Sequence, residues 1–312
     1  MAFSLCRGLE LPSDNMKVSI LLFIFLFFGN LAGRQAYAQD EIGNEEAKAA
    51  DALLAAGRNA EAEAAFRKLV ETRSKQSGPE APDTLNCRLN LARTLDNQGK
   101  YAEAEAEHRV VLASLERLLG AEHPVTLNSR SDLAITLGNL GKRDDAEKQH
   151  RQLMEIRERV LGAEHADTLA SRNNLAATLF EQKKYADAEV QHRTILAVRQ
   201  RVLGAEHPDT LSSRNNLADT IRSLGKPAEA EVENRAVLAI KERVLGSEHP
   251  SVFMSCYNLA LCLEDQKKLS EALAFMLRSE NGWVKILGTK HPYSQLAKTD
   301  RERIEAKMKE QK

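Results

Sequence analysis

Hydrophobic residues recur at helical spacing along two neighbouring segments, 82–98 and 101–119. In both segments the apolar side chains fall on one stripe of a helix, and polar residues fill the other sides. Gly99 separates the segments, and Gly120 ends the second because glycine readily adopts the left-handed conformation of a helix C-cap. Pro124 then stands where a new helix can begin. The pattern therefore predicts a pair of helices joined to the next pair by short turns.

The same pattern repeats every 42 residues without an insertion. Each copy ends in Leu-Gly, and a histidine follows three residues after the glycine. A degenerate copy of the repeat lies earlier in the chain, at Ser77-Gly78. A fixed period of this length is typical of a solenoid, in which stacked helix pairs bury the apolar face that one pair alone leaves exposed. The glycines are Gly120, Gly162, Gly204, Gly246 and Gly288, and the histidines are His123, His165, His207, His249 and His291.

Three segments resemble tetratricopeptide repeats: NLARTLDNQGKYAEAE at 90–105, NLAATLFEQKKYADAE at 174–189 and YNLALCLEDQKKLSEA at 257–272. The 42-residue period and the connector LGAEHPDTL are similar to the longer, kinesin-light-chain-like variety, here in a chain of bacterial exported type. The resemblance implies an all-α, right-handed superhelical solenoid of about six helix pairs with a C-terminal capping helix. It also implies that the first helix of each pair lines a concave groove that binds peptides or proteins.

The repeat divides the chain into four predicted parts. Residues 1–38 are a signal peptide, 39–80 a degenerate first helix pair, 81–290 five regular 42-residue units, and 291–312 a charged capping helix that keeps the array soluble. Trp283 and Phe275 are expected to pack under this cap, or alternatively to anchor a partner.

The N-terminus has the parts of a secretory signal peptide. The apolar run VSILLFIFLFF at 18–28 is shorter than the about 20 residues that a bilayer span needs, and a small-residue A-x-A pattern at 36–38 follows it. We therefore expect cleavage after Ala38 and a mature chain that is periplasmic or secreted. Met16 is the suspected true start, because acidic residues are unusual in the positively charged region of such a peptide. The alternative is an uncleaved membrane anchor.

Charge and cysteine usage exclude several classes of function. Basic and acidic residues nearly balance, at 44 and 45, so the sequence predicts no nucleic-acid partner and no membrane surface for the mature form. The cysteines have neither a disulfide framework nor the spacing of a zinc site. We therefore predict no metal and no cofactor.

The histidines argue against catalysis. Three of them, His108, His150 and His192, are also 42 residues apart, so all eight histidines follow the repeat. A catalytic histidine should be singular and placed beside one nucleophile, whereas a repeated one is better explained as a connector. We predict no catalytic residue, no enzymatic activity, and a structural role for Glu206 and His207.

A row of arginines falls on the apolar side of the first helices at Arg88, Arg130, Arg172 and Arg214. Buried charge is rare unless it is paired, and a row of glutamates recurs on the second helices at Glu105, Glu147, Glu189 and Glu231. We interpret the two rows as a ladder that sets the stacking register. An internal anion or proton pathway is the weaker alternative.

Polar residues gather on the opposite face of the first helices. Asparagine recurs at one position of this face, and an amide can both donate to and accept from a peptide backbone. The predicted partner-binding groove consists of Asn86, Asn90, Arg93, Asn174, Asn216 and Asn258. The alternative is a solvated polar face, and the mixed charges leave the ligand's charge open.

These observations predict a non-enzymatic scaffold that binds a protein or peptide partner in the concave groove, outside the cytoplasm. The alternative is an accessory subunit of an enzyme or envelope complex with a cryptic site.

Overall fold

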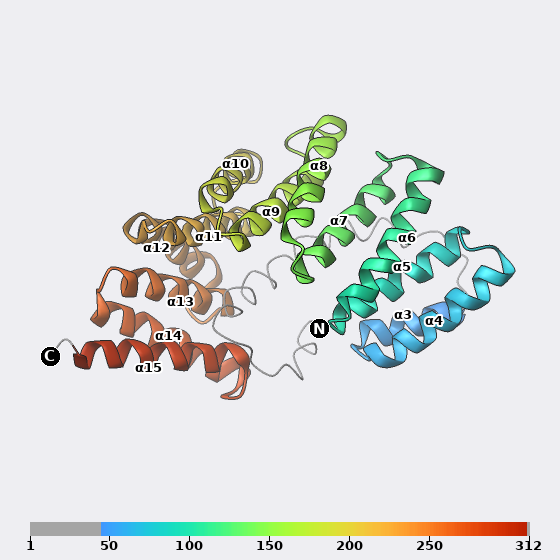
Figure 1. Ribbon diagram of the computed structural model, residues 1–312. Helices are drawn as coiled ribbons and strands as arrows, with labels where there is room; N and C mark the ends of the chain where they lie inside the picture. The colour runs from blue at the N-terminus through green and yellow to red at the C-terminus, as the bar shows by residue number, and fades with distance from the viewer. Residues whose placement is uncertain (1–44, 311–312) are drawn as a thin grey trace. The chain divides into compact units, whose positions relative to one another are not determined.

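The computed structural model describes residues 45–310, so the predicted signal peptide at 1–38 lies outside the described residues. The described part of the chain consists of thirteen α-helices without a strand (Figure 1). In chain order they are α3 Glu45–Ala55, α4 Asn59–Gln76, α5 Pro82–Asn97, α6 Tyr101–Leu119, α7 Pro124–Asn139, α8 Arg143–Leu161, α9 Ala166–Glu181, α10 Tyr185–Leu203, α11 Pro208–Ser223, α12 Pro227–Leu245, α13 Pro250–Asp265, α14 Leu269–Leu287 and α15 Pro292–Glu310. Odd-numbered helices from α3 to α13 are the first helices of their pairs, and even-numbered helices are the second.

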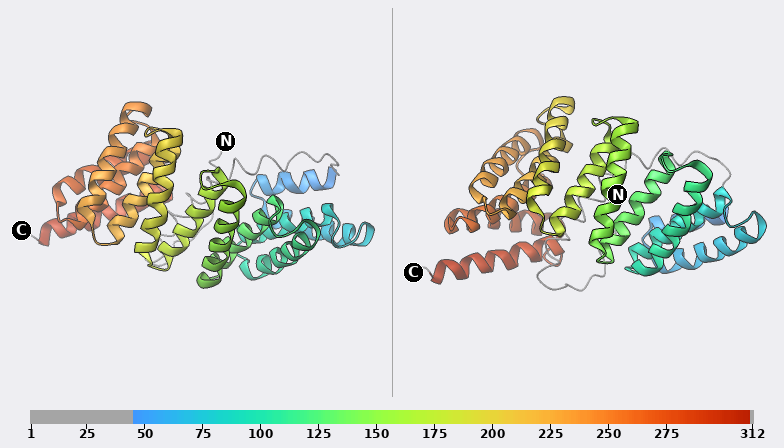
Figure 2. Two further views of the ribbon diagram at one scale, coloured as in Figure 1. Left: turned by 90° about the horizontal axis from the view of Figure 1, so that it is seen from above. Right: turned by 45° about the horizontal axis from the view of Figure 1, so that its top comes forward.

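The helices form two compact units that divide after Gln182. The first unit holds α3 to α9 and the second holds α10 to α15. Within each unit every helix packs against the next one in the sequence, as the views in Figure 2 also show. This consecutive packing confirms the predicted all-α tetratricopeptide solenoid.

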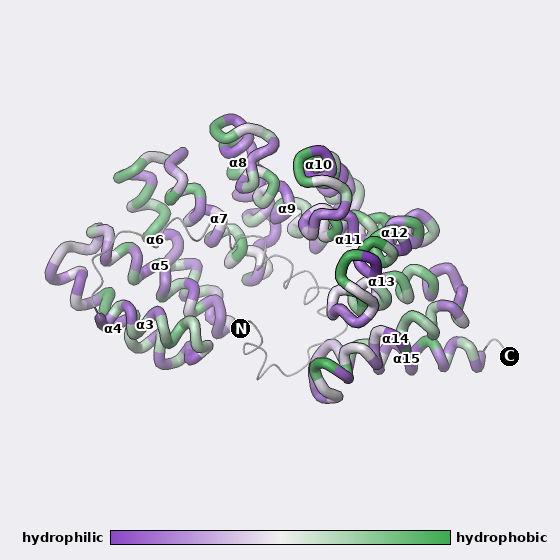
Figure 3. The backbone as a smooth tube through the Cα atoms, turned by 180° about the vertical axis from the view of Figure 1, so that it is seen from behind, coloured by the Kyte–Doolittle hydropathy of each residue, from purple (hydrophilic) through white to green (hydrophobic). Residues whose placement is uncertain are grey.

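The apolar stripes of neighbouring helices meet between them. In the first unit Leu85 of α5 packs with Val111 and Leu115 of α6. In the second unit Leu196 of α10 and Leu217 of α11 belong to one buried cluster that reaches α13. Figure 3 shows hydrophobic and hydrophilic residues alternating along single helices, so each helix has a buried side and a solvated side. Each fully buried aliphatic side chain contributes about 1.5–3 kcal/mol to folding. No described helix is both long enough and apolar enough to cross a membrane.

Each connector histidine caps the helix that follows it. Each accepts a hydrogen bond at Nδ1 from the backbone N–H two residues later, at 3.1 Å from Asp167 and 3.2 Å from Asp209. An N-cap acceptor of this kind satisfies an N–H that the helix cannot bond internally. Glu206, beside His207, forms an ion pair with Arg243 of the following repeat. The structural role predicted for Glu206 and His207 is confirmed. The other N–H donors are those of Val125, Ser251 and Tyr293.

Glutamates near the start of the second helices link successive repeats. Glu105 accepts from Lys142 Nζ at 2.7 Å, and Glu231 accepts from Lys268 Nζ at 2.8 Å. Burial would raise the pKa of Glu231, but hydrogen bonds from Lys268, Arg235 and Gln266 lower it to about 2. Both carboxylates therefore stay charged in mild acid.

The expected partnership of these glutamates with the arginine row was wrong. Arg172 pairs with Glu158 of the preceding helix at 2.7 Å, and Arg214 pairs with Glu233 of the following helix at 2.8 Å. The arginines lie at the sides of the helix interface. There a glutamate of an adjacent second helix is closer to each arginine than the glutamate of the predicted row. They are half-buried rather than enclosed.

The last helix covers the end of the second unit. Trp283 of α14 is buried, with its ring 5.1 Å from the ring of Tyr293 on α15, so its expected place under the cap is confirmed. Phe275 instead lies against the guanidinium group of Arg235, which is 5.7 Å from the ring centre. That contact is on α12, not on the cap.

Candidate functional site: the polar face of the first helices

The predicted groove residues occupy equivalent places on the first helices. Asn90, Asn174, Asn216 and Asn258 are each the ninth residue of a sixteen-residue helix. The apolar residue that follows each of them, such as Leu91 or Leu217, is buried. The side chains at the ninth position thus lie beside the core and are turned away from its centre. Although these four asparagines share one position in the repeat, their burial and their neighbours differ.

In the first unit two of the predicted groove residues belong to a chain of polar contacts across three helices. Asn90 of α5 donates from Nδ2 to Asp51 of α3 at 2.9 Å. Its own Oδ1 accepts from Arg93 at 3.4 Å, and Arg93 forms an ion pair with Asp132 of α7 at 3.0 Å. Burial raises the pKa of Asp51, while Asn90 and Arg93 oppose that shift. Asn90 and Arg93 therefore lie together in the structure, and each is bonded to a residue of a neighbouring first helix.

Asn86 and Asn174 stand apart from this chain. Asn86 is exposed near the start of α5. Asn174 on α9 is only 8% exposed, and its backbone oxygen accepts a hydrogen bond from Thr178 at 3.0 Å. A substitution of Asn174 would therefore disturb buried structure as well as any ligand.

In the second unit Asn216 on α11 and Asn258 on α13 are both half-buried, and the two helices contact each other. Thr220, one turn after Asn216, donates to the backbone oxygen of Asn216 at 2.8 Å. Two amide side chains therefore stand one repeat apart on adjacent first helices.

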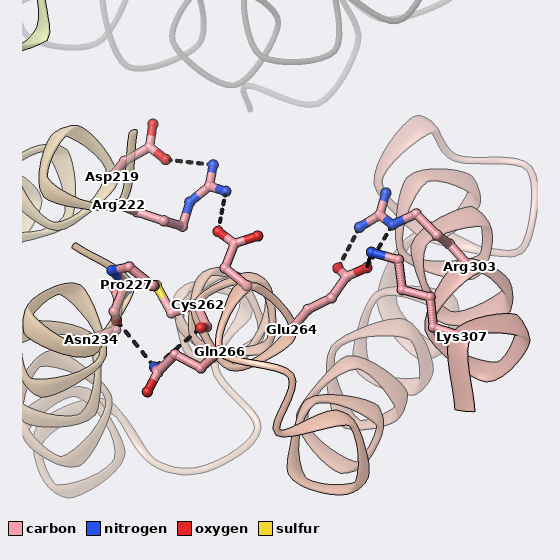
Figure 4. A network of polar contacts seen from close by, with 10 residues as sticks. Asp219, Arg222, Pro227, Asn234, Cys262, Glu264, Gln266, Arg303 and Lys307 are labelled. Atoms are coloured by element: carbon pink, nitrogen blue, oxygen red, sulfur yellow. Dashed lines mark hydrogen bonds and ion pairs between the residues drawn. The ribbon is translucent and has the colours of Figure 1, made fainter. Parts of the chain in front are cut away.

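Charged residues beside these amides were not singled out from the sequence. Arg222 of α11 donates to Asp219 of its own helix and to Asp265 of α13, both at 3.1 Å (Figure 4). Burial would lower the pKa of Arg222, but the two carboxylates raise it on balance. This cation therefore links α11 to α13.

A second network links α13 to α15. Glu264 of α13 accepts from Arg303 at 2.6 Å and from Lys307 at 2.9 Å, as Figure 4 shows. Tyr257 of α13 donates to Asp300 of α15 at 2.5 Å. Arg303 stands five repeats after Arg93, so the repeat register itself was a signal that could have identified this position.

The arrangement offers hydrogen bonds and paired charges. Along the first helices basic and acidic groups alternate and bind one another, so neither unit presents a row of one sign. Within residues 45–310 no three metal-ligating side chains gather into a cluster.

Comparison with known proteins agrees with this geometry. Two family models described as tetratricopeptide repeat match the chain, one over residues 84–125 and the other over residues 133–199 and 167–243. No curated protein matches it. Tetratricopeptide repeat families are generally protein-interaction scaffolds without enzymatic activity.

Solved structures share the fold. A kinesin-light-chain-like protein of Podosopora anserina, with nearly identical TPR-like repeats, is 28% identical with a TM-score of 0.60, over 65% of this chain and 96% of that one. BtubC (BKLC) from P. vanneervenii is 21% identical with a TM-score of 0.61, over 74% and 92%. The apo form of RapI is 12% identical with a TM-score of 0.52, over 93% and 99%. The chain therefore belongs to the tetratricopeptide repeat proteins, and its 42-residue repeats are of the kinesin-light-chain-like kind.

Proposed function

We propose that this protein is a non-enzymatic scaffold that binds a peptide or protein along the polar face of its first helices, outside the cytoplasm. The observation that carries the proposal is the pair Asn216 and Asn258, which repeat at one position on two contacting helices. An extended peptide presents donors and acceptors at regular intervals, and each amide can bind one of either kind.

The surroundings of the two asparagines support a ligand that is bound mainly through its backbone. Arg222 and Asp265 are already paired with each other, so a ligand gains little from one uniform charge. Hydrogen bonds to the ligand backbone are indifferent to its sequence, and neighbouring side chains would then provide selectivity. This division of roles predicts moderate affinity for polar peptides without a strong dependence on salt.

The test is a double substitution, Asn216→Ala with Asn258→Ala. Losing two hydrogen bonds of about 1 kcal/mol each should raise the Kd for a groove ligand by about tenfold or more. Both side chains are half-buried, so the melting temperature of each variant is measured beside its Kd to separate a loss of binding from a loss of stability. A random peptide display library panned on the full chain provides the probe, and calorimetry gives its Kd for each variant.

Glu206→Ala is the matched control, because Glu206 lies on the connector and pairs with the exposed Arg243. It should leave the Kd of the same peptide unchanged. If the control abolished binding in a folded protein while the asparagine variant bound normally, the ligand surface would be the connector edge and the groove assignment would be rejected.

The export part of the proposal is supported by the apolar run at 18–28 and the small residues at 36–38. Mass spectrometry of the protein from its native host should find a mature chain that begins at Gln39. A protein that retained residues 17–38 would contradict cleavage.

A further inference from the structure

Exposed aliphatic side chains gather at one end of the second helices. Most of the large hydrophobic residues that are exposed within residues 45–310 occupy one of the last two positions of such a helix. Val202 is 53% exposed and Val244 is 49% exposed. The turns before α10 and α14, at the opposite end of these helices, read Gln-Lys-Lys instead. The second unit therefore has an apolar edge, which consists of Val202 and Leu203 of α10, Val244 and Leu245 of α12, and Ile286 of α14.

The fold of a single chain leaves this surface unused. Basic residues stabilise the last turn of a helix in water, so an aliphatic pair there gains nothing from the helix dipole. Five aliphatic residues that are each about half exposed offer roughly 400 Å² of apolar surface, a size at which a patch on a monomer is often functional. The same two positions are aliphatic in every regular repeat. The apolar edge is therefore best explained by a partner that covers it.

Four charged residues alternate in sign along the same edge. Glu206, in the connector after α10, pairs with Arg243 near the end of α12. Glu248, in the connector after α12, pairs with Lys285 near the end of α14 at 2.7 Å. Each of the four side chains is more than half exposed. From α10 to α14 the edge therefore presents apolar, acidic, basic, apolar, acidic, basic and apolar groups in turn.

This order is complementary to itself when it is reversed. If two copies of the edge face each other in opposite directions, every acid of one copy lies opposite a base of the other. Glu206 then faces Lys285 of the second copy, and Arg243 faces Glu248 of the second copy. The apolar groups also coincide in this arrangement, with Val244 at the centre. Copies aligned in the same direction would bring like charges together, which is unfavourable.

The equivalent edge of the first unit lacks this symmetry. Its second helices α6 and α8 also end in exposed aliphatic residues. The second helix before them, α4, ends in Lys75 and Gln76, which are exposed and polar. A reversed copy would place an aliphatic pair against these polar groups. The self-complementary order is thus a property of the second unit.

We propose that the apolar edge binds a second copy of this chain in an antiparallel dimer whose twofold axis passes beside Val244. A standard interface buries about 800 Å² on each partner, somewhat more than half of it apolar. The five aliphatic residues supply most of that apolar part, and the two acid–base pairs form the polar rim. The same surface is used by both copies, so the contact closes at two. Asn216 and Asn258 lie in the middle of their helices, away from this edge, so the dimer does not depend on a groove ligand.

Sedimentation velocity over a range of concentrations, on protein purified from its native host, measures the association. The test variant is Val202→Gln with Val244→Gln, because glutamine is a good helix former and is readily solvated. It should raise the dissociation constant of the dimer by at least tenfold. The matched control is Val190→Gln with Val232→Gln, on the same two helices, where the valines are 60% and 67% exposed. These positions lie about 18 Å before the helix ends, so the control should dimerise like the natural protein.

Reversing all four charges tests the pairing itself. In the variant Glu206→Arg, Arg243→Glu, Glu248→Lys and Lys285→Glu, opposite signs still meet within each copy and between identical copies. This variant should therefore form its own dimer. It should pair poorly with the natural chain, because like charges would then face each other at all four positions. Native mass spectrometry of an equal mixture, with one chain labelled with nitrogen-15, should find about tenfold less heterodimer than random pairing gives.

Cysteine cross-linking tests the position of the axis. The native cysteines within residues 45–310 are buried and do not interfere. Val244→Cys lies beside the axis, so a short thiol cross-linker should join two copies of this variant. Val202→Cys should not cross-link to itself, but it should cross-link to Ile286→Cys when the two variants are mixed.

Several results would contradict the dimer. A natural protein that stays monomeric at every concentration would overturn the proposal, and so would a dimer that survives Val202→Gln with Val244→Gln. Random mixing of the natural and charge-reversed chains, or self-cross-linking of Val202→Cys, would reject the antiparallel arrangement. A monomer that binds vesicles of neutral phospholipid through the same two valines would assign the apolar edge to a membrane instead.

Discussion

Replacing Gly282 with isoleucine should lower the free energy of unfolding by about 3 kcal/mol, the upper end of the usual cost of overpacking a core. A Cβ atom on Gly282 would lie 2.4 Å from ring atoms of Phe253, far closer than van der Waals contact permits. Gly282 is buried in the interior of α14, and Phe253 is buried on α13. Urea unfolding of the full chain, followed by circular dichroism, measures the loss.

The repeat explains why a helix interior carries a glycine here. One repeat earlier, leucine stands in place of Phe253 and isoleucine in place of Gly282, at Leu211 and Ile240. The last pair has exchanged the sizes of the two side chains, so that a large ring on α13 fills the space that isoleucine would occupy on α14. The larger ring on α13 thus compensates in part for the side chain that α14 lacks at Gly282, as a close-packed interior requires.

The double variant Phe253→Leu with Gly282→Ile restores the pair found one repeat earlier. It should recover most of the stability that Gly282→Ile loses, whereas Phe253→Leu alone should be destabilised by about 1–2 kcal/mol because it leaves a cavity. The coupling between the two positions, obtained from the double-mutant cycle, is therefore large and favourable. A double variant no more stable than Gly282→Ile would show that the two sites are not exchanging volume.

The repeat period made the helices and the connectors between them predictable, although not that the connector histidines are N-caps. Each histidine of the connector stands at a fixed distance from a glycine and a helix start, so one local rule accounts for His123 and for the four that follow it. Local rules of this kind depend only on neighbouring residues. They therefore need no knowledge of how one pair sits on the next.

The partners of the groove residues were not predictable in the same way. A helical wheel places Asn90 and Arg93 on one face, but their bonds to Asp51 and Asp132 each span 39 residues. Those bonds depend on how successive first helices are shifted along one another. A helical wheel describes one helix at a time and gives no information on that shift. Asn174 and Asn216 show the same limit, because equal positions in the repeat differ in burial with the side chains that surround them.

The contacts of Glu264 predict the second large effect. Its side chain is only 4% exposed, while those of its partners, Arg303 and Lys307, are 44% and 50% exposed. Removing both cations by Arg303→Ala with Lys307→Ala would strand this buried carboxylate and would also take Arg303 away from the buried Asp300. Breaking a buried pair in this way costs about 3–5 kcal/mol, most of which is the penalty of an unpaired charge. We expect α15 to detach or the second unit to lose that much stability.

Neutralising the stranded group separates its charge from the lost packing. Adding Glu264→Gln to the double variant should restore the part of the stability that the charge of Glu264 costs, because a neutral amide tolerates burial far better than an unpaired carboxylate. Asp300 still lacks Arg303 in this variant and keeps only its hydrogen bond from Tyr257. Glu264→Gln alone should cost much less than the removal of the cations, since Arg303 and Lys307 can turn to solvent. Urea unfolding gives the energies, and hydrogen exchange along α15 shows whether the cap opens locally. A double variant as stable as the natural protein would mean that Glu264 draws its charge compensation from elsewhere. A triple variant without recovery would mean that the loss arises at Asp300, the other carboxylate that Arg303 binds, and not from the charge of Glu264.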